Sequence, residues 1–240
     1  DLNSTAWATV ISQAAAFITL FIHLQRTNPY IKIKKADKYF DKTILKEIIK
    51  IGFPTGIQQS VIALSQIFII GIVAIFGSNA LTAYSAASRI ESIALLLILN
   101  YSSALSSFVG QNYGATMYSR VRKSLSHSLQ ITSIISLITA IVFCCLGKEI
   151  MKLFSQTPEV LEIGFDYLFI MGLFWIILSA MNVFQSFFRG LGDTFYPMLI
   201  SILSLWIIRL PISYLLSLKM GTIGIWIGAP ISWAIGLIAY

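Results

Sequence analysis

Long apolar runs, each about 20 residues in length, follow one another along most of this chain. They cover roughly residues 6–24, 53–76, 81–108, 125–146, 167–188, 198–218 and 223–240. A helix of about 20 residues crosses a hydrocarbon layer of about 30 Å, and the shorter alternating strands of a membrane barrel are absent from the pattern. The pattern predicts an all-α membrane protein, a polytopic helical bundle with about seven transmembrane helices. Short polar turns such as "FGSNA" and "KMGTIG" make some neighbours antiparallel hairpins.

The segment between the first two runs, residues 26–50, has a different pattern. It is charged and ends in "DKTILKEIIK", where Ile44, Leu45, Ile48 and Ile49 fall on one side of a helix. Such an amphipathic helix is expected to lie on the membrane surface. Its lysines could also form a nucleic-acid patch, but no aromatic stacking platform or recognition fold accompanies them, so we expect no nucleic-acid partner.

Composition supports the membrane assignment. The 240 residues are 57% hydrophobic and only 11% charged, against about a quarter in soluble domains. A water-soluble fold of this size could not cover its surface with so few charges.

The distribution of basic residues predicts the orientation of the chain in the membrane. Because successive spans alternate sides, one set of connectors holds Arg26, Lys32, Lys34, Lys35, Lys38, Lys42, Lys46, Lys50, Arg120, Arg122, Lys123 and Arg189. The other set holds only Lys148, Lys152 and Lys219. The positive-inside rule places the first set in the cytoplasm of a multi-pass protein of the cell membrane. The net charge of +7 then reflects topology and contact with anionic membrane lipids.

The residue types that carry catalysis or bind metals form no known pattern. Cys144 and Cys145 are adjacent on an apolar helix and point about 100° apart, which favours small apolar filler over a disulfide. His23 and His127 lie near span ends without a partner at metal-ligand spacing. With no phosphate loop, dinucleotide fingerprint, HExxH or GxSxG motif, we expect no catalytic residue, no metal site and no enzyme activity.

Two ionisable side chains lie deep within the third span. Arg89 and Glu91 follow the preceding turn by about 10 to 12 residues, hence by about 15–18 Å. A charge at that depth is costly and normally faces a cavity or a partner. Glu91 is therefore either a carboxylate that carries a proton or cation, or one half of an ion pair between helices. Arg89 points to another side of the helix, where it is a candidate for the cavity lining.

Amides form a second set of candidates for the cavity lining. Gln59 and Gln66 share a face of the second span, Asn182 and Gln185 lie three apart on the fifth, and Asn100 lies in the third. Buried amides need partners, which are either neighbouring helices or the water and substrate of a polar path.

Three stretches of the chain resemble the second half of the multidrug and toxic compound extrusion (MATE) family. They are "ASRIESIALLLILNYSSALSSFVGQNYGA", "FFRGLGDTFYPM" and "RLPISYLL...MGTIGIWIGAPISW". "TAWATVISQ" is similar to that family's sixth helix and "IGFPTGIQQ" to the start of its seventh. The resemblance follows the family's order over almost the whole chain.

The resemblance implies a fold of twelve helices in two six-helix lobes. Residues 1–25 would then be the last helix of the first lobe, residues 26–50 the basic cytoplasmic linker, and residues 51–240 the second lobe with its last helix truncated. The partners implied are the missing first lobe and small-molecule substrates, typically cationic or amphipathic drugs. Family members exchange them for H⁺ or Na⁺ by alternating access, so no cofactor is expected beyond that coupling ion.

Two glycine-containing turns are expected to be architectural. Gly110, Gln111, Asn112 and Gly114 interrupt the apolar pattern after the third span, where glycine permits a tight or left-handed backbone and the amides can bond open carbonyls. The turn after the fifth span holds Arg189, Gly190, Gly192 and Asp193.

The chain departs from the family in its acidic residues. Some branches place a cation-binding acid in the seventh and tenth helices, where this chain has only amides, which leaves Glu91 as the candidate for the coupling ion. An alternative function is a lipid-linked oligosaccharide or polysaccharide flippase of the same superfamily, which would need a more cationic cavity. A membrane scaffold or receptor would lack buried ionisable groups and proline-kinked helices.

Overall fold

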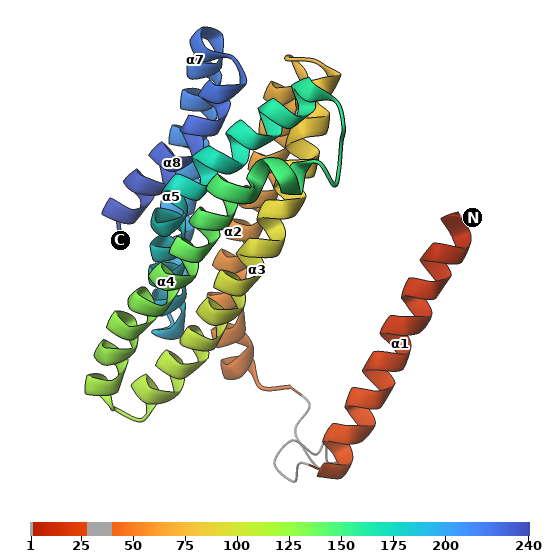
Figure 1. The fold of residues 1–240 in the computed structure, drawn as a ribbon. Helices are drawn as coiled ribbons and strands as arrows, with labels where there is room; N and C mark the ends of the chain where they lie inside the picture. The colour runs from red at the N-terminus through yellow and green to blue at the C-terminus, as the bar shows by residue number, and fades with distance from the viewer. Residues whose placement is uncertain (1, 28–39) are drawn as a thin grey trace. The chain divides into compact units, whose positions relative to one another are not determined.

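The computed structural model describes residues 2–27 and 40–240, which fall into two compact units, residues 1–47 and 48–240. Residues 28–39, and with them four of the lysines used above for orientation, lie outside the described part. The first unit contains α1 (Leu2–Thr27) and the start of α2 (Lys42–Ala74). The second unit holds the rest of α2 and the bundle coloured from orange to blue in Figure 1.

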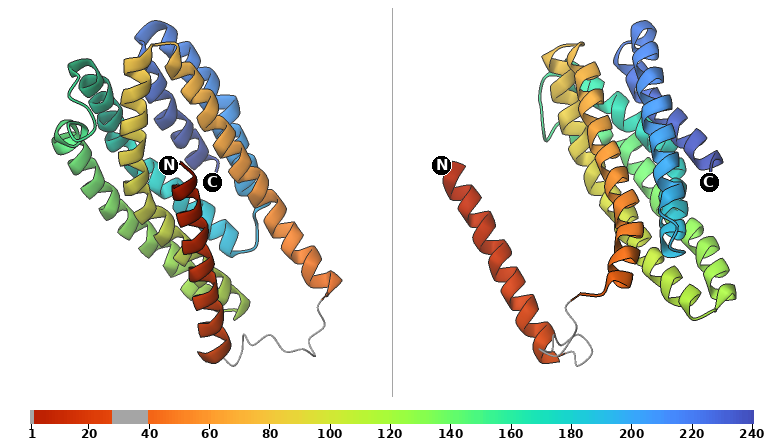
Figure 2. Two further views of the ribbon diagram at one scale, coloured as in Figure 1. Left: turned by 90° about the vertical axis from the view of Figure 1, so that its right-hand side faces the viewer. Right: turned by 180° about the vertical axis from the view of Figure 1, so that it is seen from behind.

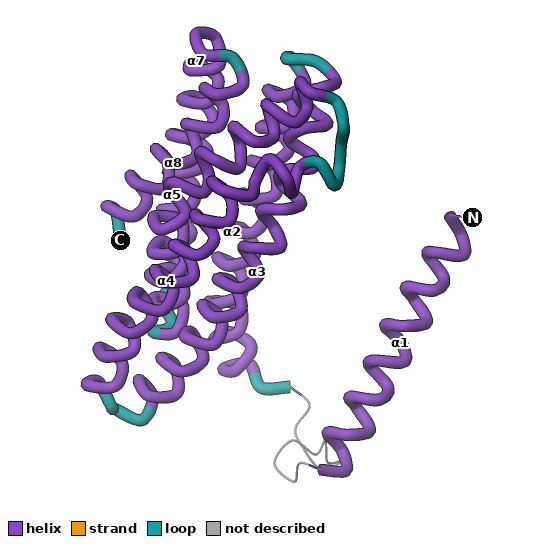
Figure 3. The backbone as a smooth tube through the Cα atoms, in the orientation of Figure 1, coloured by secondary structure: helices purple, strands orange, loops and turns teal. Residues whose placement is uncertain are grey.

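Helices make up nearly all of the described chain, as the tube in Figure 3 shows. After α2 come α3 (Ser78–Gly114), α4 (Tyr118–Met151), α5 (Pro158–Gly190), α6 (Phe195–Ile202), a π-helix η1 (Leu203–Arg209), α7 (Leu210–Met220) and α8 (Thr222–Ile238). Six helical stretches of the described residues are long and apolar enough to cross a membrane, and α8 is a shorter apolar helix. The predicted fold class, an all-α multi-pass membrane protein, is confirmed.

The two faces of α4 show why this bundle belongs in lipid. Its outer face presents Ile134, Leu137, Ile138 and Ile141, each more than half exposed, at helical spacing. Its inner face buries the small hydroxyl residues Ser128, Thr132, Ser136 and Thr139. Three of these hydroxyls donate to carbonyls of the same helix, as Ser136 does to Thr132 at 2.7 Å. Small residues let helices approach closely in a membrane, where apolar side chains can face lipid.

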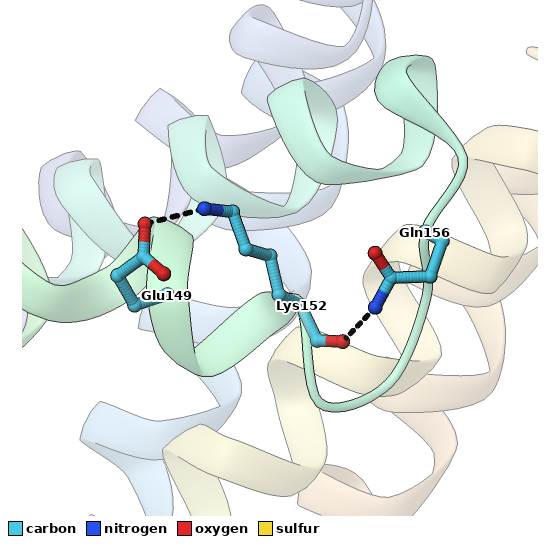
Figure 4. A network of polar contacts seen from close by, with 3 residues as sticks. All are labelled: Glu149, Lys152 and Gln156. Carbon is cyan, nitrogen blue, oxygen red and sulfur yellow. Dashed lines mark hydrogen bonds and ion pairs between the residues drawn. The ribbon is translucent and has the colours of Figure 1, made fainter.

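The connections of the second unit lie at its two ends. In Figures 1 and 2 the α3–α4 and α5–α6 turns lie at one end, and the α2–α3, α4–α5 and α7–α8 turns lie at the other. Both predicted turn motifs therefore lie at the same end, the one expected to face the cytoplasm. The α4–α5 connection is tied by an exposed ion pair between Lys152 and Glu149 at 2.6 Å and by a bond from Gln156 to the Lys152 carbonyl at 2.8 Å (Figure 4).

The segment "DKTILKEIIK" is not a separate surface helix, contrary to the sequence prediction. Residues from Lys42 onward form the first turns of α2, which continues through Pro54 to Ala74. Asp41 caps this helix, accepting a bond from the Thr43 backbone N–H at 2.7 Å. The amphipathic spacing of this segment did not mark the end of a helix. Helix α2 also continues without interruption through Pro54.

The glycines of the first turn motif also differ from expectation. Gly110 and Gly114 lie inside α3, and the positive φ of this turn, 59°, belongs to Thr116. Asn112 does bond a carbonyl, that of Phe108 at 2.8 Å, but within the helix. Gly110 instead packs against α5, where a Cβ would lie 3.3 Å from the Gly190 carbonyl oxygen. In the second motif Gly192 does take a positive φ of 86°.

Candidate functional site

The second unit encloses a cavity of about 290 Å³ between α2, α3, α5 and the C-terminal helices. Its lining brings together five of the residues predicted from the sequence, Gln59, Gln66, Glu91, Asn182 and Gln185. These residues come from three helices, α2, α3 and α5. The cavity is therefore the candidate functional site.

Glu91 is held by a neighbouring helix. Its Oε2 accepts a hydrogen bond from the hydroxyl of Tyr167 on α5. Tyr167 is almost fully buried at 2% exposure, so its hydroxyl has little access to competing water. The bond holds one carboxylate oxygen of this lining residue, and the other oxygen forms no hydrogen bond to any described residue.

An aromatic cluster forms the wall behind Glu91. Trp226 of α8 stacks on Tyr84 of α3 with ring centroids 5.5 Å apart and meets Tyr167 edge-on at 4.9 Å. Tyr84 also donates to Gln66 Oε1 at 2.9 Å, which joins α3 to α2. Such clusters have large contact areas and fixed geometry, so they position the carboxylate and the amide.

Arg209 is a further residue of the cavity lining, from the C-terminal helices. It belongs to η1 and is only 9% exposed, and its Nε has no hydrogen-bond partner among the described residues. Its charge lies within electrostatic range of Glu91, yet the two side chains form no ion pair in the described part of the chain. The ion-pair alternative for Glu91 is thus not realised in this conformation.

The π-helix that carries Arg209 directly precedes a proline. Pro211 follows it at the second position of α7 and lacks a backbone N–H, which removes one helical hydrogen bond. π-Helical turns are frequent at functional sites. Pro230 lies inside α8, whose helix continues past it.

Two of the predicted lining residues lie elsewhere. Arg89 is exposed on another face of α3 and does not line the cavity. Asn100 is exposed too and bonds the Leu96 carbonyl of its own helix at 2.8 Å. Both were predicted to lie within the third span, but position along a helix does not fix the side to which a residue points.

Several lining residues escaped the sequence interpretation. Gln58 is 2% exposed and donates to Ser201 Oγ at 2.7 Å and to the Pro197 carbonyl at 3.1 Å. Arg209 and Trp233 come from distant parts of the chain, and Arg189 of the second turn motif also reaches the lining. Proximity to Gln59 was the only sequence signal for Gln58, and none pointed to Trp233.

Comparison with known proteins identifies relatives over most of the chain. The MatE family model matches residues 54–215. A probable multidrug resistance protein of Bacillus subtilis, YoeA, is 27% identical over 99% of this chain and 52% of its own length. A probable multidrug resistance protein NorM of Thermotoga maritima is 26% identical over 76% of this chain and 40% of its own.

The fold has close structural neighbours as well. One is the outward-facing conformation of a multidrug resistance MATE family transporter of the MOP superfamily, with a TM-score of 0.88 and 20% identity. The match covers 97% of this chain and 53% of that one. The chain thus spans about half the length of the relatives it matches.

Proposed function

Since this chain belongs to the MATE family, as the family model and its relatives show, we propose that it acts as the second lobe of a drug exporter. A first lobe, carried by the same transporter, would complete the cleft. The substrates would be cationic or amphipathic drugs, exported in exchange for H⁺ or Na⁺. The relatives named above favour this role over a flippase for lipid-linked oligosaccharides, and the expectation of a non-enzyme agrees with a transporter family.

The observation that carries the proposal is the convergence of Glu91 and the amides on one cavity. A carboxylate anchored through one oxygen by Tyr167 can accept a proton, a metal cation or the charged end of a drug at its other oxygen. These occupants compete for the same charge, so binding of one would favour release of another. Mutual exclusion of this kind is what antiport requires.

The surroundings of Glu91 suit an amphipathic cation. Leu95, Leu99 and Leu178 supply apolar contact area, while Gln59, Gln66 and Gln185 supply donors and acceptors that do not select one substrate shape. Arg209 would act as an internal counter-charge that keeps an empty carboxylate from binding cations too tightly.

The proposed topology places the α3–α4 and α5–α6 turns in the cytoplasm. The support for it is the excess of basic residues on the connectors at that end, with Arg120, Arg122, Lys123 and Arg189 among the described residues. The cavity would then open outward or inward as the two lobes rock against each other.

Dye efflux by the full-length transporter in a pump-deficient host tests the function. We expect Glu91→Gln to leave expression unchanged and to abolish most efflux of a fluorescent cation, because the amide cannot carry the exchanged charge. Glu162→Gln, which removes an exposed carboxylate outside the cavity on α5, is the matched control and should export normally. Normal efflux by both variants would contradict the proposal.

A further inference from the structure

A second hollow lies on another face of the bundle, in a groove between α3 and α4 with a volume of about 610 Å³. It shares no lining residue with the cavity around Glu91. The α4 side contributes Arg120, Lys123 and His127, and the α3 side contributes Tyr101, Ala104 and Phe108. The drug-export proposal assigns no function to this groove.

The charge of the groove is positive. Its described lining holds two permanent cations and a histidine but no carboxylate, and all three basic side chains are exposed. None of them forms an ion pair within the described residues. A cationic drug would be repelled here, whereas a phosphate group would find Arg and Lys donors together.

The groove is charged near the start of α4 and carries hydroxyl-bearing residues farther along that helix. Helix α4 begins at Tyr118. Measured along the helix from that residue, Arg120 lies at about 3 Å and His127 at about 14 Å. Ala104 and Phe108 form an apolar wall beside them. Deeper in the groove, the hydroxyls of Tyr101 and Ser128 face each other at 3.5 Å.

We propose that this groove binds an anionic phospholipid of the cytoplasmic leaflet. Its phosphate would lie against Arg120 and Lys123, with His127 below, and an acyl chain would follow Ala104 and Phe108. Basic pockets between membrane helices on the cytoplasmic side bind anionic headgroups by this chemistry. A free phosphate ion would leave the apolar wall unused, so a lipid is the occupant that the whole groove fits.

Native mass spectrometry of the protein in detergent, titrated with dioleoyl phosphatidylglycerol, tests the site. The double variant Arg120→Gln/Lys123→Gln should weaken binding of the first lipid about tenfold or more. The matched control Arg122→Gln/Lys50→Gln removes the same charge from exposed residues of the second unit outside the groove, and should bind within about twofold of the parent. Dioleoyl phosphatidylcholine should bind weakly and equally to all three proteins.

A second variant tests the shape of the groove separately from its charge. Ala104→Trp fills the groove and keeps every basic residue, and it should also weaken phosphatidylglycerol binding, while Ile138→Trp on the exposed face of α4 should not. Equal losses in both double variants would show that only overall charge matters and would overturn the proposal. So would competition by soluble glycerol 3-phosphate, or unchanged lipid binding in Ala104→Trp.

Discussion

Helix α3 meets α5 in two different ways along its length. In the half of α3 that follows the α2–α3 turn, Glu91 accepts a hydrogen bond from Tyr167, and Tyr84 meets the Tyr167 ring edge-on with centroids 5.6 Å apart. Near the other end, Gly110 meets the backbone at Gly190, where no side chain separates the helices. Large polar and aromatic side chains keep helices apart and leave a cavity beside them, whereas glycines close the gap. We therefore expect the glycine contact to govern stability and the polar contact to govern transport.

The largest effect on stability should follow a change at the glycine contact. A Cβ at Gly190 would lie 2.7 Å from both the Ser106 carbonyl oxygen and the Val109 Cβ. Because a backbone carbonyl cannot move aside easily, Gly190→Ala should destabilise the protein by about 1–3 kcal/mol, the usual cost of overpacking. Thermal unfolding of the purified protein in detergent measures this as a melting temperature lower by several degrees.

The control for this change is Gly71→Ala in α2. Gly71 is also helical, but a Cβ there would meet nothing within 4 Å. We expect an unchanged or slightly higher melting temperature, since alanine is the better helix former by about 1 kcal/mol. If the two variants unfolded at the same temperature, the α3–α5 glycine contact would not be a tight point of the bundle.

Adjacent glutamines of α2 offer an intermediate test. Gln58→Leu removes the hydrogen bonds to Ser201 and Pro197. It should cost about 0.6 kcal/mol, the average for such bonds between membrane helices, and no more than about 1.7 kcal/mol. Gln59→Leu changes an exposed side chain of the cavity lining, so it should leave the melting temperature unchanged but alter drug affinity. The reverse assignment of effects would contradict the distinction between the buried, hydrogen-bonded Gln58 and the exposed Gln59 of the same cavity lining.

The smallest effect is expected at the exposed Glu149–Lys152 pair. The two side chains are 64% and 43% exposed, so water screens their attraction. Lys152→Gln should change the free energy of unfolding by less than about 0.5 kcal/mol. A loss comparable to that of Gly190→Ala would mean that the α4–α5 connection stabilises the bundle, against this account.

The sequence predicted the helices well because an apolar helix must have a certain length, about 20 residues, to cross the hydrocarbon layer of a bilayer. It also named Glu91, Gln59, Gln66, Asn182 and Gln185 as separate candidates from their polarity within apolar spans, but it did not predict that all five would line one cavity. The predicted division into residues 1–25, 26–50 and 51–240 stays a prediction, as do the roles of the site residues.

The predictions that failed, for Arg89, Asn100 and Gly110, have a common physical cause. The face that a helix turns toward its neighbours depends on contacts between distant segments of the chain. Arg89 and Asn100 belong to α3 like Glu91, but they are exposed on faces of that helix that do not line the cavity. Gly110 looks like a turn residue until its neighbour Gly190, 80 positions away, is placed beside it. The roles of Arg209 and Trp233 follow from the packing of η1 and α8 against the rest of the bundle, which local patterns do not encode.

The central claim is that Glu91 binds either the coupling cation or the drug, and equilibrium binding tests it most directly. Affinity of the full-length protein for a fluorescent cation would be measured while H⁺ and Na⁺ are raised separately, in the parent and in Glu91→Gln. We predict that one of the two ions weakens binding by about 5–150-fold in the parent, the usual range of coupling between sites, and that the effect vanishes in Glu91→Gln. Competition of the same size in both proteins would show that the exchange takes place elsewhere.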